Sequence, residues 1–166
     1  MTAAGDGVRA DVSFSAGAAD GPTAALRDGM ESRITFTLRF YERRPGLAGL
    51  FGDALLAERT VVRAAFYDFF DRRFVVEQDG VRASYADEAV FLATFFRLRG
   101  IELAPATEAR GEADAGGGPS RYVAARAQYD PVRLSPPLTI LTLFGFAARH
   151  TTPWVRQAVP FRETSP

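Results

Sequence analysis

The side chains with the clearest chemical potential lie near the carboxyl end of the chain. His150 is the only histidine among 166 residues, Arg149 precedes it, and Trp154 follows four positions later. An imidazole can act as a general base when an acidic partner and a substrate cleft lie beside it. An arginine and an indole can together recognise a small anion or an aromatic group. These three residues are therefore the candidate binding site.

Other groups that could do chemistry are scarce. The closest acidic residues form two pairs, Asp68 with Asp71 and Asp87 with Glu88. The first pair is typical of a turn, and the second of the first turn of a helix. With one histidine and no cysteine, only scattered carboxylates could bind a metal. The run Gly116–Gly118 is not a phosphate-binding loop, because no strand precedes it and no helix with a lysine follows it. We therefore expect no catalytic residue, no metal and no cofactor.

The charge balance argues against nucleic acid as a partner. Twenty arginines and no lysine face twenty acidic residues, so the formal net charge is zero. Proteins that bind nucleic acid without sequence preference carry a cationic excess, because phosphate neutralisation supplies most of their affinity. Arginines alternate with aromatic residues at 39–44 and 66–74. Strand alternation predicts that the aromatic residues lie on one face and the arginines largely on the other.

Composition also limits the class of protein. Apolar residues make up 47% of the chain, which is enough for one core, and 166 residues suit one domain. No apolar stretch approaches the roughly 18–20 residues that span a bilayer, so we expect no transmembrane segment. Residues 1–7 do not have the pattern of a secretory signal, which favours the cytoplasm unless a signal has been removed.

Alternating residues predict the elements that would position these groups. Ile34, Phe36, Leu38 and Phe40 alternate with polar residues, which is typical of a strand over about 31–43 with one buried face. Similar patterns predict strands at 8–14, 59–70, 73–78, 101–103 and 121–130. Asp71-Arg72 and Asp79-Gly80 have the chemistry of two-residue turns.

Helical spacing begins after Ser84. Ser84 and Asp87 resemble a capping box, apolar residues follow at intervals of three and four, and Gly100 suits a left-handed C-cap. This pattern predicts a helix at about 85–98. Shorter helical turns are expected at 22–28 and 47–51. Residues 138–146 are apolar on all sides and fit a short buried helix or a central strand.

These elements predict a mainly β protein of the α+β class. We expect an antiparallel, sandwich-like sheet packed with the helix at about 85–98. Residues 8–159 would form a single domain between a disordered start at 1–7 and a tail at 160–166. Residues 105–119 hold no large apolar side chain, so we expect a flexible loop there.

The order of these features resembles a bacterial family of small envelope proteins with a domain of unknown function. The resemblance covers about 8–155 and is carried by Leu26–Gly29, Arg33–Tyr41, Tyr67–Val76, Asp87–Leu98, Arg121–Val123 and Leu134–Leu138. It implies a mostly β, sandwich-like domain, exported to the periplasm or cell envelope, with no established activity. Members are often encoded beside a membrane sensor histidine kinase. This chain differs in its start and in its Gly/Ala/Glu insertion at 105–119.

Three functional hypotheses follow. The leading one is a non-enzymatic envelope module that binds a partner protein or an apolar ligand through an open sheet edge or through residues 138–146. The second is a carrier, in which residues 66–76 and the helix at 85–98 enclose a lipid-sized cavity. The third is a hydrolase or transferase that uses His150.

Overall fold

Antiparallel strands dominate the structure. The computed structural model describes residues 2–4, 7–15, 21–44, 46–103, 121–133 and 149–159. The larger sheet has the order β10 (Val155–Ala158), β8 (Arg121–Arg133), β3 (Glu31–Glu42), β4 (Ala54–Asp68), β5 (Arg73–Gln78), β6 (Val81–Tyr85), and β9 (His150–Thr151) pairs with β8. The smaller sheet has the order β1 (Thr2–Ala4), β2 (Gly7–Ser13), β7 (Arg97–Leu103). The predicted mainly β fold is confirmed.

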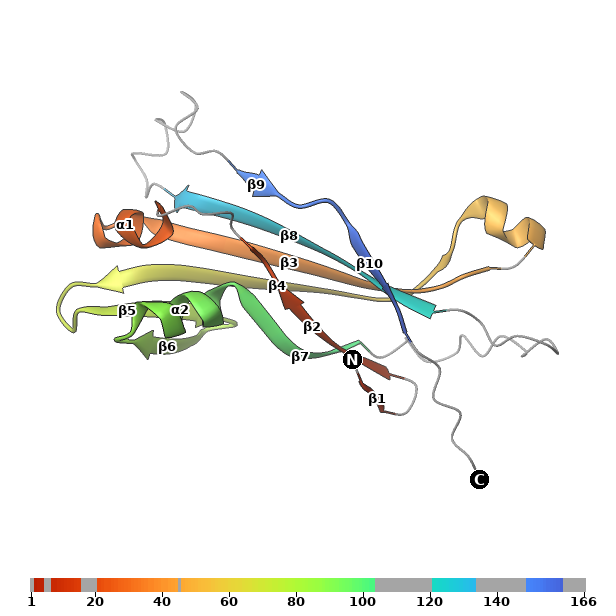
Figure 1. The fold of residues 1–166 in the computed structure, drawn as a ribbon, viewed down its shortest axis with the longest axis horizontal. Helices are drawn as coiled ribbons and strands as arrows, with labels where there is room; N and C mark the ends of the chain where they lie inside the picture. The colour runs from red at the N-terminus through yellow and green to blue at the C-terminus, as the bar shows by residue number, and fades with distance from the viewer. Residues whose placement is uncertain are drawn as a thin grey trace.

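The alternation in β3 decides which face of the large sheet is covered. Ile34, Phe36, Leu38 and Phe40 are all 0% exposed, whereas the residues between them are half-buried. We call the first face the inner face and the other the outer face. Side chains from the small sheet and both α-helices join the inner face in one core, so the two sheets form packed layers (Figure 1).

The helices lie where the sequence predicts them, but α2 differs from the prediction in length. Helix α1 (Gly21–Arg27) and the 3-10 helix η1 (Gly46–Phe51) occupy the two predicted short turns. Helix α2 (Glu88–Phe95) is shorter than the predicted 85–98 at both ends. Its N-cap is Asp87, whose carboxylate accepts the Val90 N–H at 2.9 Å.

Strand pairing explains why α2 is short. β6 continues to Tyr85, which pairs with Phe74 of β5, so the predicted capping role of Ser84 is wrong. At the other end Arg97 pairs with Ser13 of β2. Gly100 has a positive φ of 64°, as predicted, but it lies in β7 and does not cap the helix.

Two hairpin turns connect β4, β5 and β6. Asp79 and Gly80 have φ values of 52° and 78°, which is the geometry of the expected two-residue turn. The other turn is longer than the predicted Asp71-Arg72, because β4 ends at Asp68 and β5 begins at Arg73. The Asp68 carboxylate accepts the N–H groups of Phe70 and Asp71 and stabilises the four-residue turn.

The start of the chain also differs from the prediction. We expected disorder over 1–7, but Thr2–Ala4 form β1 and pair with β2. The predicted loop at 105–119, the apolar segment at 138–146 and the tail at 160–166 lie outside the described residues. None of the helices in the described part of the chain has the length and apolar character that crossing a bilayer requires.

Candidate functional site

The three candidate residues do not form one site. Arg149 donates from Nε to the Asp130 carboxylate at 2.7 Å. His150 lies in β9 opposite Tyr129, and the two rings stack with centroids 6.5 Å apart. Among the described residues, no acidic side chain makes a hydrogen bond or ion pair with the imidazole. His150 and the described acidic side chains therefore do not form the pair of general base and acidic partner.

Trp154 belongs to a separate cluster on the outer face. The Arg39 guanidinium lies 4.8 Å from the Trp154 ring and that of Arg126 lies 6.0 Å from it. Arg39 also donates to Glu58 at 2.7 Å, and this hydrogen bond raises the pKa of Arg39. Because the cation already has an acidic partner and a ring, the cluster is typical of packing on a sheet surface.

This cluster corrects the expected separation of arginines from aromatic residues. Arg39 and Tyr41 share the outer face of β3, where Tyr41 stacks on Tyr122 with ring centroids 5.2 Å apart. Arg43 and Arg156 lie 5.8 and 5.7 Å from the Tyr122 ring. Residues two positions apart in a strand lie on the same face, so Arg39 and Tyr41 lie together although one is charged and the other aromatic.

The acidic pairs have structural roles. Asp68 accepts hydrogen bonds within the β4–β5 turn, and Asp87 caps α2. Glu88 accepts a hydrogen bond from Arg27 of α1 at 2.7 Å. Each carboxylate thus stabilises the end of an element or joins two elements, as the turn and helix-start interpretations predict.

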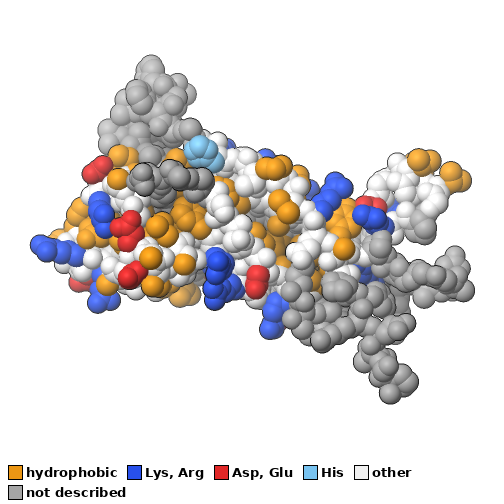
Figure 2. Space-filling model, in the orientation of Figure 1, with side chains coloured by type: hydrophobic (Ala, Val, Ile, Leu, Met, Phe, Trp, Pro, Cys, Tyr) orange, Lys and Arg blue, Asp and Glu red, His pale blue; other side chains and the backbone are white. Residues whose placement is uncertain are grey.

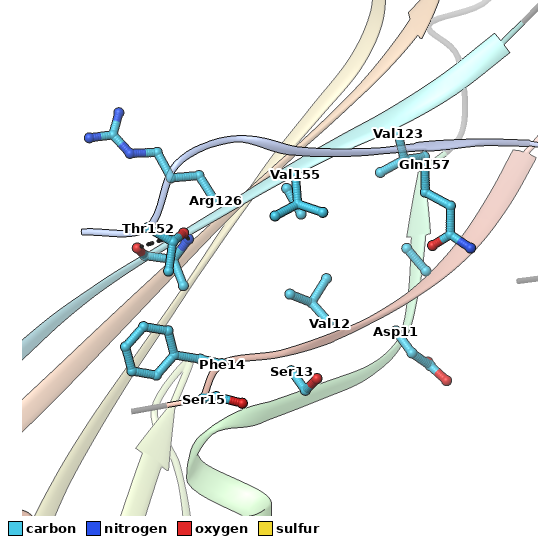
Figure 3. Close-up of a pocket in the computed structure, with 13 residues that line it drawn as sticks. Asp11, Val12, Ser13, Phe14, Ser15, Val123, Arg126, Thr152, Val155 and Gln157 are labelled. Atoms are coloured by element: carbon cyan, nitrogen blue, oxygen red, sulfur yellow. Dashed lines mark hydrogen bonds between the residues drawn. The ribbon is translucent and has the colours of Figure 1, made fainter. Parts of the chain in front are cut away.

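A pocket of about 270 Å³ lies between the small sheet and one end of the large sheet. Its walls come from β2, β8 and the segment that leads through Thr152 into β10. Figure 3 shows Val12 of β2 and Val155 of β10 pointing toward one another across it, while the Arg126 guanidinium points away. Val155 is 63% exposed although it lines this space. The pocket therefore contains apolar surface that no described side chain covers.

The remaining lining is small and mixed. Val123, Ala125 and Ala127 of β8 form the apolar floor, and Phe14 lies at one end, where its ring centroid is 5.9 Å from that of Tyr129. Thr152 is anchored to β8, because its N–H donates to the Ala127 carbonyl at 2.9 Å and its hydroxyl accepts the Ala127 N–H at 3.0 Å. The polar residues Asp11, Ser13, Ser15 and Gln157 also line the pocket, so an apolar floor is combined with polar groups.

Two strand edges flank this pocket. β2 pairs with β7 along one side, but on its other side β1 covers only Gly7–Arg9. Ala10–Ser13 therefore have one edge that no described strand pairs with. β10 is the terminal strand of the large sheet and pairs only with β8 among the described residues. Both strands border the pocket, and Figure 3 shows Val12 of β2 on one side of it and Val155 and Gln157 of β10 on the other.

The space expected for a lipid-sized cavity is filled. Phe74 of β5 stacks on Phe91 of α2 with centroids 4.7 Å apart, and Phe91 stacks on Phe95 at 5.7 Å. All three rings are at most 2% exposed. The carrier hypothesis placed its cavity between residues 66–76 and the helix, and these aromatic side chains occupy that region.

Two buried tyrosines predict a loss of stability in alkali. Burial raises the pKa of Tyr129 above the ordinary 10.0, and burial and the hydrogen bond to Asp53 raise that of Tyr122. Above about pH 10 an unfolded tyrosine loses its proton while these two keep theirs, so the free energy of unfolding should fall as pH rises. Urea unfolding between neutral pH and about pH 11 measures this slope.

The variant Tyr129→Phe isolates one of the two tyrosines. The Ser32 hydroxyl donates to the Pro131 carbonyl at 2.6 Å and not to Tyr129. The Tyr129 hydroxyl therefore has no hydrogen-bond partner among the described residues. Removing it should leave stability at neutral pH nearly unchanged and reduce the alkaline loss. A slope equal to that of the wild type would show that Tyr129 ionises normally in the folded protein.

Comparisons with known proteins give no match to a family model, a curated protein or a solved structure. The pocket and the surfaces around it are therefore the structural features that bear on function.

Proposed function

We propose that this protein is a non-enzymatic binding module that accepts an extended segment of a partner protein between β2 and β10. The added segment would pair with one or both strand edges and insert alternate apolar side chains into the pocket. Main-chain hydrogen bonds supply affinity in this mode of recognition, and the side-chain pocket supplies specificity.

The observation that carries the proposal is the meeting of two incomplete strand edges at one apolar pocket. Edge strands normally leave N–H and C=O groups without strand partners, and proteins protect such edges from unwanted pairing. Here an exposed valine and a stretch of β2 backbone that no described strand pairs with lie beside the same space. A polypeptide satisfies both features, because it offers backbone groups and alternating side chains.

The size of the pocket favours side chains over a whole lipid. Pockets for drug-sized ligands usually measure about 300–1,000 Å³, whereas this one measures about 270 Å³. It suits one or two aliphatic side chains of an extended segment. A small apolar molecule is the competing ligand, and the test below separates the two.

We also propose that the module acts in the bacterial cell envelope. This part of the proposal is supported by the family resemblance of residues 8–155. Fractionation of the native host with an antibody against the protein tests it, and recovery of the protein only in the cytoplasm would contradict it.

Selection of peptides displayed on phage tests the binding mode. Peptides that alternate apolar and polar residues should bind the wild type and fail to bind the variant Ala125→Phe, whose ring fills the pocket floor. Val62→Phe makes a similar change on the outer face, where Val62 is 40% exposed, and should bind like the wild type. Hydrogen exchange should slow at the amides of β10 and of Ala10–Ser13 when peptide binds.

Other outcomes would contradict the proposal. Equal binding by Ala125→Phe, or slowed exchange only at other strands, would move the site elsewhere. Binding of decanoate to the wild type and not to Ala125→Phe, without any selected peptide, would favour the small-ligand carrier.

A further inference from the structure

The helix η1 carries the most exposed apolar side chains at one end of the molecule. Leu47, Leu50 and Phe51 are 81%, 79% and 88% exposed. Figure 1 shows η1 projecting beyond the ends of β3 and β4, and Figure 2 shows hydrophobic side chains at the outer end of this projection. Single exposed apolar residues are common on proteins, but three large ones within five positions at a protruding tip form a patch.

The backbone of this tip has a defined conformation. Gly52 has a φ of 87°, and its N–H donates to the Gly49 carbonyl at 3.1 Å. A Cβ atom at Gly49 would lie 2.7 Å from the Arg44 carbonyl oxygen, so the chain folds back tightly on itself there. The loop therefore presents its apolar side chains from a turn that needs glycine.

Positive charge surrounds the base of the tip. Arg43 and Arg44 precede η1 and are exposed, and Arg156 lies with Arg43 near the Tyr122 ring. The two acidic groups that the structure describes at the base of the tip each have a partner. Glu42 forms an ion pair with Arg121 at 3.0 Å, and the Asp53 carboxylate accepts the Tyr122 hydroxyl at 2.7 Å.

We infer that η1 is a membrane-contact site that inserts into the surface of a bilayer containing anionic lipids. The order along the projection matches the order of a membrane interface: aliphatic and aromatic side chains at the outer end, arginines behind them, and the Tyr41–Tyr122 pair at the base. Apolar area and attraction between basic residues and anionic lipids add together in such contacts. The cationic base favours an anionic lipid surface over an apolar protein pocket.

This site is separate from the strand-binding pocket. None of the η1 residues lines that pocket. Loss of peptide binding in Ala125→Phe should therefore leave vesicle binding unchanged, so the two proposals can fail independently.

Co-sedimentation with vesicles tests the inference. The wild type should bind phosphatidylcholine vesicles that contain phosphatidylglycerol more tightly than vesicles of phosphatidylcholine alone. L47S/L50S/F51S should reduce the partition coefficient by more than about tenfold, because three apolar side chains no longer enter the bilayer. R43Q/R44Q should reduce it by about tenfold or more on anionic vesicles and far less on neutral ones.

The exposed apolar residues at the opposite end provide a matched control. Phe70 is 100% exposed in the β4–β5 turn, and F70S should bind vesicles like the wild type. As a second readout, the emission of F51W should shift to the blue when anionic vesicles are added, beyond any shift of the wild-type Trp154 signal. The emission of F70W should not show this additional shift.

Several results would overturn the inference. The wild type could fail to bind either kind of vesicle, or L47S/L50S/F51S could have the same partition coefficient as the wild type. F70S could also lower the partition coefficient as much as L47S/L50S/F51S does. Sedimentation equilibrium that shows a dimer dissociated by L47S/L50S/F51S, with no vesicle binding, would assign the tip to a second copy of the chain instead.

Discussion

Replacing Phe91 by alanine should lower the free energy of unfolding by about 3–5 kcal/mol. Phe91 is 0% exposed and its ring stacks on Phe74 of β5 and on Phe95 within α2. Its removal leaves a cavity between the helix and the sheet, and the aligned neighbouring rings cannot easily close it. The expected loss is therefore the transfer energy of a large apolar side chain together with the cost of the cavity.

Urea unfolding followed by far-ultraviolet circular dichroism measures this change. Phe70→Ala is the control, because Phe70 is 100% exposed and should change stability by no more than about 0.5 kcal/mol. Similar small effects of both substitutions would mean that α2 does not pack on β5 in solution.

The strands were predictable where the local sequence pattern and the packing of the folded protein favour the same structure. In β3 the alternation of apolar and polar residues agrees with burial on one face and partial exposure on the other. β5 has the predicted bounds, because the Asp79-Gly80 turn fixes where it ends and turn residues precede it. Local chemistry and tertiary packing agree in these segments, and the sequence is then informative.

The ends of α2 and β4 were less predictable because distant strands decide them. Ser84 and Arg97 could extend a helix on local grounds, but both lie in strands that pair with β5 and β2. β4 begins five positions before the predicted Arg59, since Ala54–Glu58 pair with β3. Such pairings compete with local propensity and are not visible in a short window of sequence.

The sequence predicts the type of candidate site, an open sheet edge, but not the residues that form the pocket. An open sheet edge was expected, but nothing local marks Val12 and Val155 as neighbours across a pocket. They are 143 positions apart, and only the strand order places both near β8. Grouping Arg149, His150 and Trp154 by sequence was misleading, because β9 takes the first two to Tyr129 and Asp130 while Trp154 lies at Arg39.

Removing the Arg63 guanidinium should also destabilise the folded protein. It projects from β4 on the inner face, opposite Ile34 of β3, where apolar side chains otherwise predominate. Its Nη1 donates to the carbonyl oxygens of Thr94 at 2.6 Å and Arg97 at 2.7 Å, and its Nε donates to Gln78 at 2.6 Å. The Thr94 carbonyl is at the C-terminal end of α2, so Arg63 supplies a donor where a helix lacks its own.

Burial lowers the pKa of the Arg63 guanidinium from its ordinary value, which reflects the cost of removing this cation from water. Arg63→Met keeps much of the aliphatic stem but leaves the two carbonyl groups and the Gln78 amide oxygen without their donor. An unsatisfied, partly buried acceptor costs about 1–3 kcal/mol, so we expect the free energy of unfolding to fall by about 2–3 kcal/mol.

Hydrogen exchange and a matched variant distinguish this role from a general effect of charge. Exchange should accelerate most at the amides of α2 and of the start of β7, because Arg63 joins those two elements to β4. Arg59→Met removes an exposed arginine from the same face of the same strand and should cost no more than about 0.5 kcal/mol. Equal losses from the two substitutions would mean that Arg63 does not secure the end of α2. A large loss confined to Arg63→Met would show that a cation on the apolar face of the sheet holds the helix in place.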